Sequence, residues 1–142
     1  MAVTALYLLD KSALARVPRN PAVQAALEHL DDSGLLATSA IVELEIGYSA
    51  RNIAEFDSVD ADRRSLYQEL ALTKSATDRA RHVQRELVKR GQHRGPGVSD
   101  LLIAATAEVH GAIVVHYDRD FDIISEITGQ PTQWIVPAGS VD

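Results

Sequence analysis

Short apolar runs, separated by longer and more polar segments, dominate the hydrophobic pattern of this chain. The runs occupy residues 3–9, 35–38, 112–116 and 133–136, and the third places three β-branched residues in a row. Continuous apolar runs of this length, without alternating polar positions, are typical of strands that are buried on both faces of a parallel sheet. The pattern therefore predicts four strands in the interior of the molecule.

The segments between these runs carry apolar residues at helical spacing. Turn and cap residues such as Gly91 and Gly111 mark helix ends, and Ser39 and Ser99 are the expected N-caps of two of the helices. The predicted helices cover residues 13–17, 21–30, 40–50, 53–72, 75–90, 100–110 and 121–128. Strands that alternate with helices predict an α/β fold with three layers, in which helices flank a short parallel sheet. A length of 142 residues suits a single domain, residues 1–142.

Composition narrows the chemistry. The chain has no cysteine, which excludes disulfides, thiolate metal sites and a cysteine nucleophile. Its net charge is −6, so any binding of nucleic acid needs a local basic patch or bound cations. The apolar start is too short for a membrane span and lacks the basic flank of a signal peptide. We therefore expect a cytoplasmic protein with no membrane partner.

Two of the predicted strands end on carboxylates, Asp10 after the first and Asp118 after the strand 112–116. Open α/β sheets bind ligands at the carboxyl ends of their strands. Glu43 and Asp100 lie in the first turns of helices that follow segments returning to the same edge. Gly47 shares a helical face with Glu43 and would leave room beside that carboxylate.

Four ionised carboxylates in one place repel one another unless a cation lies among them. A ligand set made only of oxygen atoms selects Mg²⁺, with Mn²⁺ able to substitute. Such a cation holds phosphates and activates a bound water for hydrolysis. The competing interpretation is that Asp10 only caps the turn that follows it.

Four motifs in order along the chain resemble the PIN domain, and their length and spacing resemble the VapC-type toxins of bacterial toxin–antitoxin systems. The motifs are the strand ending in Asp10-Lys11-Ser12, then Ser39 to Gly47, then Ser99 to Ala107, then His116 to Phe121. The resemblance covers essentially the whole chain. Lys11 stands where the family often carries Thr.

The resemblance implies a metal-dependent endoribonuclease with tRNA or rRNA as its usual target. By the resemblance the catalytic acids are Asp10, Glu43, Asp100 and Asp118, and the metal ligands are Asp10, Asp100 and Asp118. Ser12 matches the hydroxyl that orients the first acid, and Asp120 is an auxiliary acid. The resemblance also implies a homodimer, and a small antitoxin protein that covers the acids and places an Arg or Lys among them.

Other polar residues have more than one interpretation. Glu45 is two residues from Glu43 and is expected to be structural or exposed. His116 is expected to be a structural residue at a strand end. Arg81, Arg85 and Lys89 form a stripe at helical spacing, which is either a solvated face or a surface that contacts RNA phosphates.

Two rival functions stay in view. Haloacid-dehalogenase-like phosphatases also place an Asp at a strand end, but a second Asp follows two residues later, where this chain has Ser12. The other rival is a PIN-like module that binds a protein and has no catalytic role. Four retained acids argue against it, because clustered carboxylates without a cation destabilise a fold.

Overall fold

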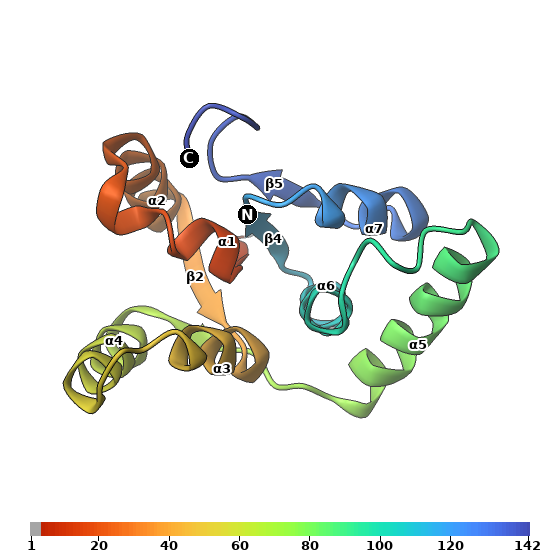
Figure 1. The fold of residues 1–142 in the computed structure, drawn as a ribbon, viewed down its shortest axis with the longest axis horizontal. Coiled ribbons are helices and arrows are strands. Elements are labelled where there is room, and N and C mark those ends of the chain that lie inside the picture. The colour runs from red at the N-terminus through yellow and green to blue at the C-terminus, as the bar shows by residue number, and fades with distance from the viewer. Residues whose placement is uncertain (1–3) are drawn as a thin grey trace.

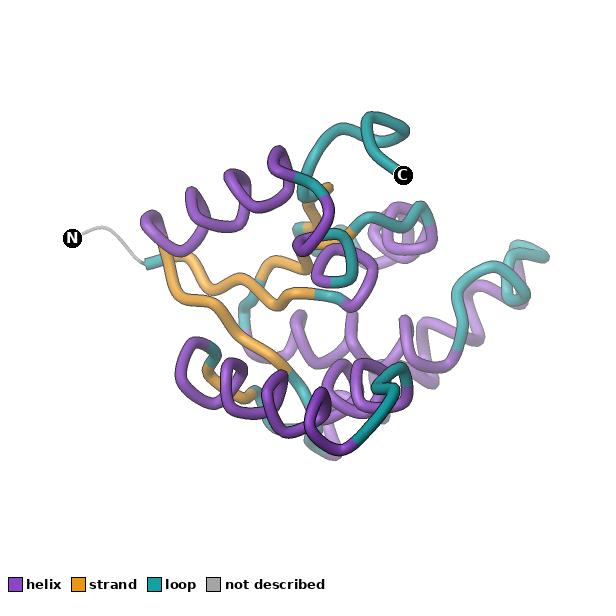
Figure 2. The backbone as a smooth tube through the Cα atoms, turned by 60° about the vertical axis from the view of Figure 1, so that its left-hand side comes forward, coloured by secondary structure: helices purple, strands orange, loops and turns teal. Residues whose placement is uncertain are grey.

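The computed structural model describes residues 4–142, so Val3, the first residue of the predicted first strand, lies outside the described part. Five parallel strands form one sheet in the order β3-β2-β1-β4-β5. They run through the centre of the molecule with helices on either side (Figures 1 and 2). The strands are β1 (Ala5–Leu9), β2 (Gly34–Thr38), β3 (Gln68–Glu69), β4 (Ile113–His116) and β5 (Thr132–Trp134).

Seven α-helices and one short 3₁₀ helix connect these strands within the described residues. They are α1 (Lys11–Leu14), the 3₁₀ helix η1 (Val17–Arg19), α2 (Pro21–Ser33), α3 (Ala40–Tyr48), α4 (Ile53–Leu66), α5 (Lys74–Lys89), α6 (Val98–His110) and α7 (Asp120–Thr128). The predicted α/β fold with a parallel sheet between helices is confirmed. The pattern missed β3, because the predicted helix 53–72 ends at Leu66 and the chain then extends along β2.

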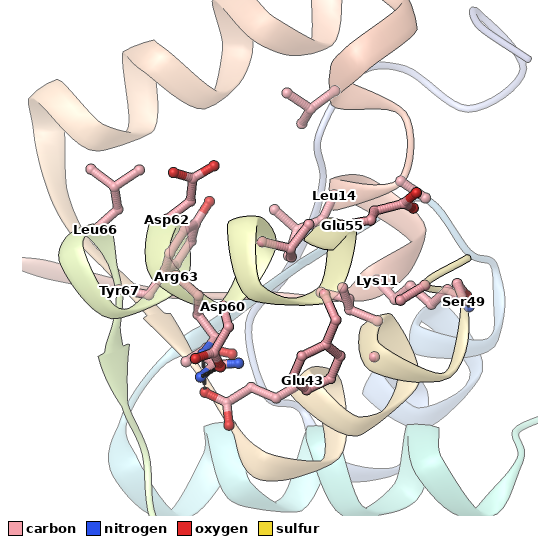
Figure 3. A pocket seen from close by; sticks show the side chains of 18 of the residues that line it. Lys11, Leu14, Glu43, Ser49, Glu55, Asp60, Asp62, Arg63, Leu66 and Tyr67 are labelled. Carbon is pink, nitrogen blue, oxygen red and sulfur yellow. Dashed lines mark hydrogen bonds and ion pairs between the residues drawn. The ribbon is translucent and has the colours of Figure 1, made fainter. Parts of the chain in front are cut away.

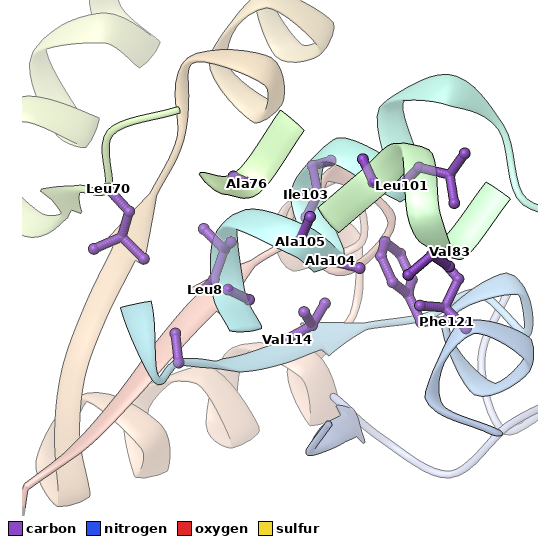
Figure 4. Close-up of a cluster of buried hydrophobic side chains, with 14 of the residues drawn as sticks. Leu8, Leu70, Ala76, Val83, Leu101, Ile103, Ala104, Ala105, Val114 and Phe121 are labelled. Carbon is purple, nitrogen blue, oxygen red and sulfur yellow. The ribbon is translucent and has the colours of Figure 1, made fainter. Parts of the chain in front are cut away.

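Alternation along the central strands sends side chains to two separate cores. Leu8 and Val114 are fully buried on one face, under α3, α5, α6 and α7. Small residues of α6, including Ala104 and Ala105, allow this helix to lie close to those strands (Figure 4). Leu9 and its neighbours on the other face pack against α1 and α2. Each fully buried Leu or Val contributes about 1.5–3 kcal/mol relative to an exposed one, so the sheet is fixed from both sides.

Helix starts follow local capping chemistry. Ser39 Oγ accepts a hydrogen bond from the Val42 amide, as expected for the N-cap of α3. The predicted cap at Ser99 is wrong, because α6 begins two residues earlier with Gly97 as its N-cap. Asp100 is then the third residue of that helix, and its Oδ2 accepts from the Gly97 amide at 3.0 Å. This hydrogen bond places the carboxylate at the start of α6.

The sheet topology defines where a ligand can bind. From β1 the chain moves outward through β2 and β3 on one side, then crosses to β4 and β5 on the other. The strand order therefore reverses between β1 and β4, and such switch points at the carboxyl ends of strands leave a crevice for ligands. Leu9 pairs with Val115 in register, so Asp10 follows β1 at the level where β4 ends.

Candidate active site

Asp10 is held firmly at this switch point. Its amide donates to the Val115 carbonyl at 2.9 Å, which extends the pairing of β1 with β4 by one residue. Its Oδ2 accepts from the amide of Ser12 at 3.0 Å and from the hydroxyl of Ser12 at 2.6 Å. The side chain is 5% exposed. Asp10 therefore does cap α1, and the same contacts fix the direction of its carboxylate.

Ser12 links the two strand ends. Its hydroxyl donates to Asp10 and accepts from the Tyr117 amide at 2.9 Å. Because Tyr117 directly follows β4 and precedes Asp118, the hydroxyl joins the first and fourth predicted acids through one atom. This geometry suits the orienting role that the family resemblance implies.

Three carboxylates meet beside Asp10. Oxygen atoms of Asp100, Asp118 and Asp120 all lie within 4.8 Å of one another. Asp118 Oδ1 accepts from the Asp120 amide at 2.9 Å, so the turn after β4 presents both side chains together. We call Asp10 and these three residues the acid cluster. Asp120, expected to be an auxiliary acid, is one of the three.

The acid cluster is electrostatically strained without a cation. Burial raises the pKa of Asp100 to about 7, with further contributions from the charges of Asp118, Asp10 and Asp120. Burial and the charge of Asp118 also raise the pKa of Asp120. Oxygen ligands at this spacing, with charges that repel one another, fit a hard divalent cation. The donor set of the acid cluster is therefore compatible with Mg²⁺ or Mn²⁺.

Glu43 does not join the acid cluster. Its Oε1 lies 2.6 Å from Nε of Arg63 on α4, and Asp60 pairs with the same guanidinium (Figure 3). Burial, which outweighs the opposing charge of Arg63, raises its pKa. The structure therefore contradicts the expected position of Glu43, whose carboxylate holds α3 to α4.

Gly47 also serves α4 rather than the acids. A Cβ added at Gly47 would meet Cε2 of Phe56 at 2.9 Å, so the glycine makes room for this ring. Phe56 and its neighbours line an apolar pocket of about 480 Å³ between α3 and α4, which we call the α4 pocket (Figure 3). Glu43, Asp60 and Arg63 form its polar edge.

Glu45 is the acid of α3 that faces Asp10. Burial and the charge of Asp10 raise the pKa of Glu45, while Lys11 opposes this shift. Glu45 also lines a small hollow with Lys11 and with Ser99, the neighbour of Asp100. Glu45 was expected to be structural or exposed, and one signal in the helix bears on its position. The fully buried Val42 marks the inward face of α3, and Glu45 lies one turn after it on that side.

His116 supports the turn that carries Asp118. It is fully buried between the rings of Phe121 and Trp134, with ring centroids 5.0 and 5.1 Å away. The Asp118 amide donates to His116 Nδ1 at 3.1 Å. Burial lowers the pKa of His116, which favours the neutral ring that this acceptor role requires. The structural role that was predicted for His116 therefore includes a hydrogen bond to the backbone of Asp118, a member of the acid cluster.

The predicted basic stripe is partly neutralised on its own helix. Arg81 pairs with Asp78 at 2.9 Å and Lys89 with Glu86 at 3.3 Å, both within α5. Asp78 is shared with Lys74, and Arg85 takes part in no ion pair within the described part of the chain. The stripe therefore keeps some net positive charge, and a contact with RNA phosphates stays a prediction.

Comparisons with known proteins agree with this geometry. The family model described as PIN domain matches residues 7–127. Ribonuclease VapC51 of Mycobacterium tuberculosis is 48% identical over 136 residues, covering 96% of this chain and 97% of that protein. Ribonuclease VapC21 of the same species is 42% identical over 138 residues, covering 97% of this chain and 99% of that protein.

Solved structures show the same fold at lower identity. VapBC2 from Rickettsia felis, bound to a DNA fragment from its promoter, matches with a TM-score of 0.76 and 22% identity, covering 91% of this chain and 98% of that chain. VapBC-1 from nontypeable Haemophilus influenzae matches with a TM-score of 0.76 and 19% identity, covering 92% of this chain and 98% of that chain.

Proposed function

The chain belongs to the PIN domain family and to its VapC ribonucleases, and from this premise we propose that it is a metal-dependent endoribonuclease, the toxin of a toxin–antitoxin pair. The observation that carries the proposal is the acid cluster at the switch point of the sheet. Relatives that match nearly the full length of the chain are named ribonucleases. The proposed catalytic unit is the single domain 1–142.

The proposed metal ligands are Asp10, Asp100 and Asp118, with Asp120 beside them, and the proposed ion is Mg²⁺ or Mn²⁺. When bound, such an ion neutralises charge on a phosphate and lowers the pKa of a bound water. Asp10 contributes an ionised carboxylate whose direction is fixed by Ser12. Asp118 is fixed in turn by His116, which accepts from its amide.

Glu45 replaces Glu43 as the proposed second catalytic acid. A carboxylate with a raised pKa, beside Asp10 at the edge of the acid cluster, is suited to orient a water and to accept its proton. Attack by water on the phosphodiester would leave 5′-phosphate and 3′-hydroxyl ends. Glu43 is left with a structural role, because Arg63 occupies its carboxylate.

The proposed substrate is RNA, with tRNA or rRNA as the usual class for toxins of this kind. The direct test is cleavage of total tRNA and of rRNA by the purified protein, with Mn²⁺ and with EDTA. Cleavage that requires the cation supports the proposal. If the protein binds its partner but cleaves neither RNA, with Mn²⁺ or with EDTA, the result would instead support a non-catalytic module.

A small antitoxin is the proposed protein partner. The structural neighbours named above are VapBC structures. This chain has an apolar surface suited to a partner segment. Helix α4 has no buried residue, and Phe56, Val59 and Leu66 remain 41–58% exposed around the α4 pocket. Covering them with apolar side chains of an antitoxin would stabilise the complex.

A homodimer is the proposed assembly. Leu44 and Tyr48 lie one turn apart on α3 and are 71% and 91% exposed, and Val98 at the start of α6 is 72% exposed. Large apolar side chains at this exposure favour an interface. Leu44 and Tyr48 also line the hollow with Glu45, so a second copy would border the acid cluster.

The proposed location is the cytoplasm. Among the described residues, none of the helices has the length and hydropathy that a membrane span requires.

A further inference from the structure

Arg16 and Arg119 carry positive charge beside Asp118 of the acid cluster, and neither was part of the predicted basic stripe. Both residues line an open pocket of about 740 Å³ that also includes Asp118. Neither guanidinium has a carboxylate side chain within ion-pair distance in the described residues. Two cationic groups are therefore available to a ligand directly beside the acid cluster.

Arg16 is fixed in place by contacts to backbone oxygens. Its Nη1 donates to the Ser12 carbonyl at 2.7 Å, and its Nε donates to the backbone oxygen of Asp142 at 2.9 Å. The guanidinium carbon lies 4.3 Å from the centroid of the Tyr117 ring. A long side chain that is already ordered loses little rotamer entropy on binding, so this cation is preorganised.

Tyr117 supports this guanidinium and is fixed by the C-terminal segment. Its hydroxyl donates to the Val141 carbonyl at 2.9 Å and accepts from the Val141 amide at 3.1 Å. The edge of its ring contacts Trp134, with centroids 5.2 Å apart. Trp134 in turn donates from Nε1 to Asp122 at 3.1 Å. Arg16 and Tyr117 thus form a planar cationic platform, named here the Arg16 platform.

We propose that this pocket is a nucleotide subsite that holds the RNA next to the phosphate cleaved at the acid cluster, with a phosphate between Arg16 and Arg119 and a base against the Arg16 platform. The inference rests on the proposed function and adds the surface that binds the strand. Guanidinium groups pair with phosphate through a planar set of donors, and bases stack on guanidinium planes. A chain with a net charge of −6 needs such a local group to hold RNA.

The limits of the pocket define the length of this subsite. Glu126, which is exposed, and Asp122 line the same pocket, so their charges repel phosphate at these two points of the wall. The favourable part is therefore the region between Asp118 and the two arginines. This part of the pocket would therefore hold a single nucleotide, on one side of the cleaved bond.

The test measures RNA binding apart from cleavage. The probe is a fluorescein-labelled 12-nucleotide single-stranded RNA of mixed sequence, titrated in EDTA against Asp100→Asn and against the same protein with a second change. Arg16→Gln and Arg119→Gln remove charge from the pocket. Arg19→Gln removes the same charge from η1, where the side chain is exposed and outside the pocket. Arg85→Gln removes it from the α5 stripe.

The expected result is about a tenfold loss of affinity for Arg16→Gln and for Arg119→Gln, with the slope of log affinity against log salt reduced by about one. Arg19→Gln and Arg85→Gln should stay within about twofold of their parent. Arg16→Lys keeps the charge but lacks the planar group on which a base stacks, so it should bind intact RNA more weakly than the parent does. Both proteins should bind an RNA with an abasic nucleotide with equal affinity.

Two failures are distinguishable. If both pocket variants bind as the parent does, or Arg85→Gln alone weakens binding, the subsite is wrong while cation-dependent cleavage by the wild type can still stand. If the wild type neither binds nor cleaves RNA, the proposed function and the subsite fall together. Arg119 is exposed and makes no packing contribution, so its variant decides the matter even if Arg16→Gln unfolds.

Discussion

Glu43 Oε1 lies 2.6 Å from Nε of Arg63, an ion pair that joins α3 to α4 and directs this carboxylate away from Asp10. Glu45, two residues later, is the α3 acid whose pKa is raised by the charge of Asp10. Successive residues of a helix point about 100° apart, so two positions separate the faces that the two acids occupy. The helix thus carries, within a single turn, one acid paired with Arg63 and one acid that feels the charge of Asp10.

Exchange of these two acids for Gln separates their roles. Glu45→Gln should reduce RNA cleavage by about 100-fold or more, because it removes a proton acceptor at the site. Glu43→Gln should leave cleavage within about threefold and lower the free energy of unfolding by about 1 kcal/mol through the lost ion pair. Rates on one RNA substrate and urea unfolding of both variants give the answer. Loss of cleavage in a folded Glu43→Gln protein, with Glu45→Gln active, would restore Glu43 as the catalytic acid.

His116 accepts a hydrogen bond from the Asp118 amide and also packs between two rings, and two variants separate these roles. His116→Asn keeps an acceptor two residues before the amide but loses the ring between Phe121 and Trp134. His116→Phe keeps the packing and loses the acceptor. We expect His116→Phe to weaken Mn²⁺ binding by about tenfold, as is usual when a group supporting a metal ligand is removed.

Isothermal titration with Mn²⁺ and thermal melts in EDTA measure the two properties separately. His116→Asn should melt earlier than His116→Phe and bind Mn²⁺ more tightly. Equal Mn²⁺ affinity in both variants would show that His116 only fills space.

The acids at the switch point were predictable from sequence because the cause is topological. A parallel sheet brings the residues after its strands to one edge, so Asp10 and Asp118 could be placed together from apolar runs alone. The PIN domain resemblance drawn from the four motifs is confirmed by the family match. The turn in which Asp118 accepts from the Asp120 amide, and which brings the two side chains together, cannot be recognised from spacing.

The features that could not be placed from sequence depend on helix rotation and on tertiary contacts. The positions of Glu43 and Glu45 depend on the rotation of α3, which the buried Val42 fixes through packing with the core. The position of Arg16 depends on Tyr117 and on the C-terminal segment, which are more than 100 residues away in the chain. No local sequence pattern encodes such contacts. The two-residue strand β3 was missed for another reason, because the predicted helix 53–72 included its residues.

The stability of the metal-free protein should depend on pH in a defined direction. Burial and neighbouring carboxylates raise the pKa of Asp100 to about 7 in the folded state. The pKa of Asp in an unfolded chain is about 3.9. Between these values the folded state holds a proton that the unfolded state has lost. The free energy of unfolding in EDTA should therefore fall as pH rises from about 4 to about 7 and then level off.

Urea unfolding in EDTA across this range, for wild type and Asp100→Asn, measures the slope. Asn cannot ionise, so the variant should lose much of the decline, while Asp57→Asn at an exposed position of α4 should keep it. Added Mn²⁺ should stabilise the wild type more than Asp100→Asn, because binding to the native state adds stability. Identical slopes in all three proteins would mean that Asp100 ionises normally.

The α4 pocket predicts where antitoxin binding and cleavage separate. Val59→Asp adds a charge at the apolar wall of the pocket and lies outside the acid cluster. The variant should cleave RNA as the wild type does and lose at least about tenfold in affinity for the antitoxin. Asp57→Asn serves again as the exposed control on the same helix. Unchanged inhibition of Val59→Asp by the antitoxin would locate the interface elsewhere.

The source of the attacking oxygen tests the central claim most directly. RNA is cleaved by the wild-type protein with Mg²⁺ in water enriched in ¹⁸O, and the first products are analysed by mass spectrometry before further reaction. If the acid cluster directs a water onto the phosphodiester, the new 5′-phosphate carries one ¹⁸O, and cleavage stops in EDTA and in Asp100→Asn. Initial products with 2′,3′-cyclic phosphate and no ¹⁸O, formed equally well in EDTA, would contradict the account.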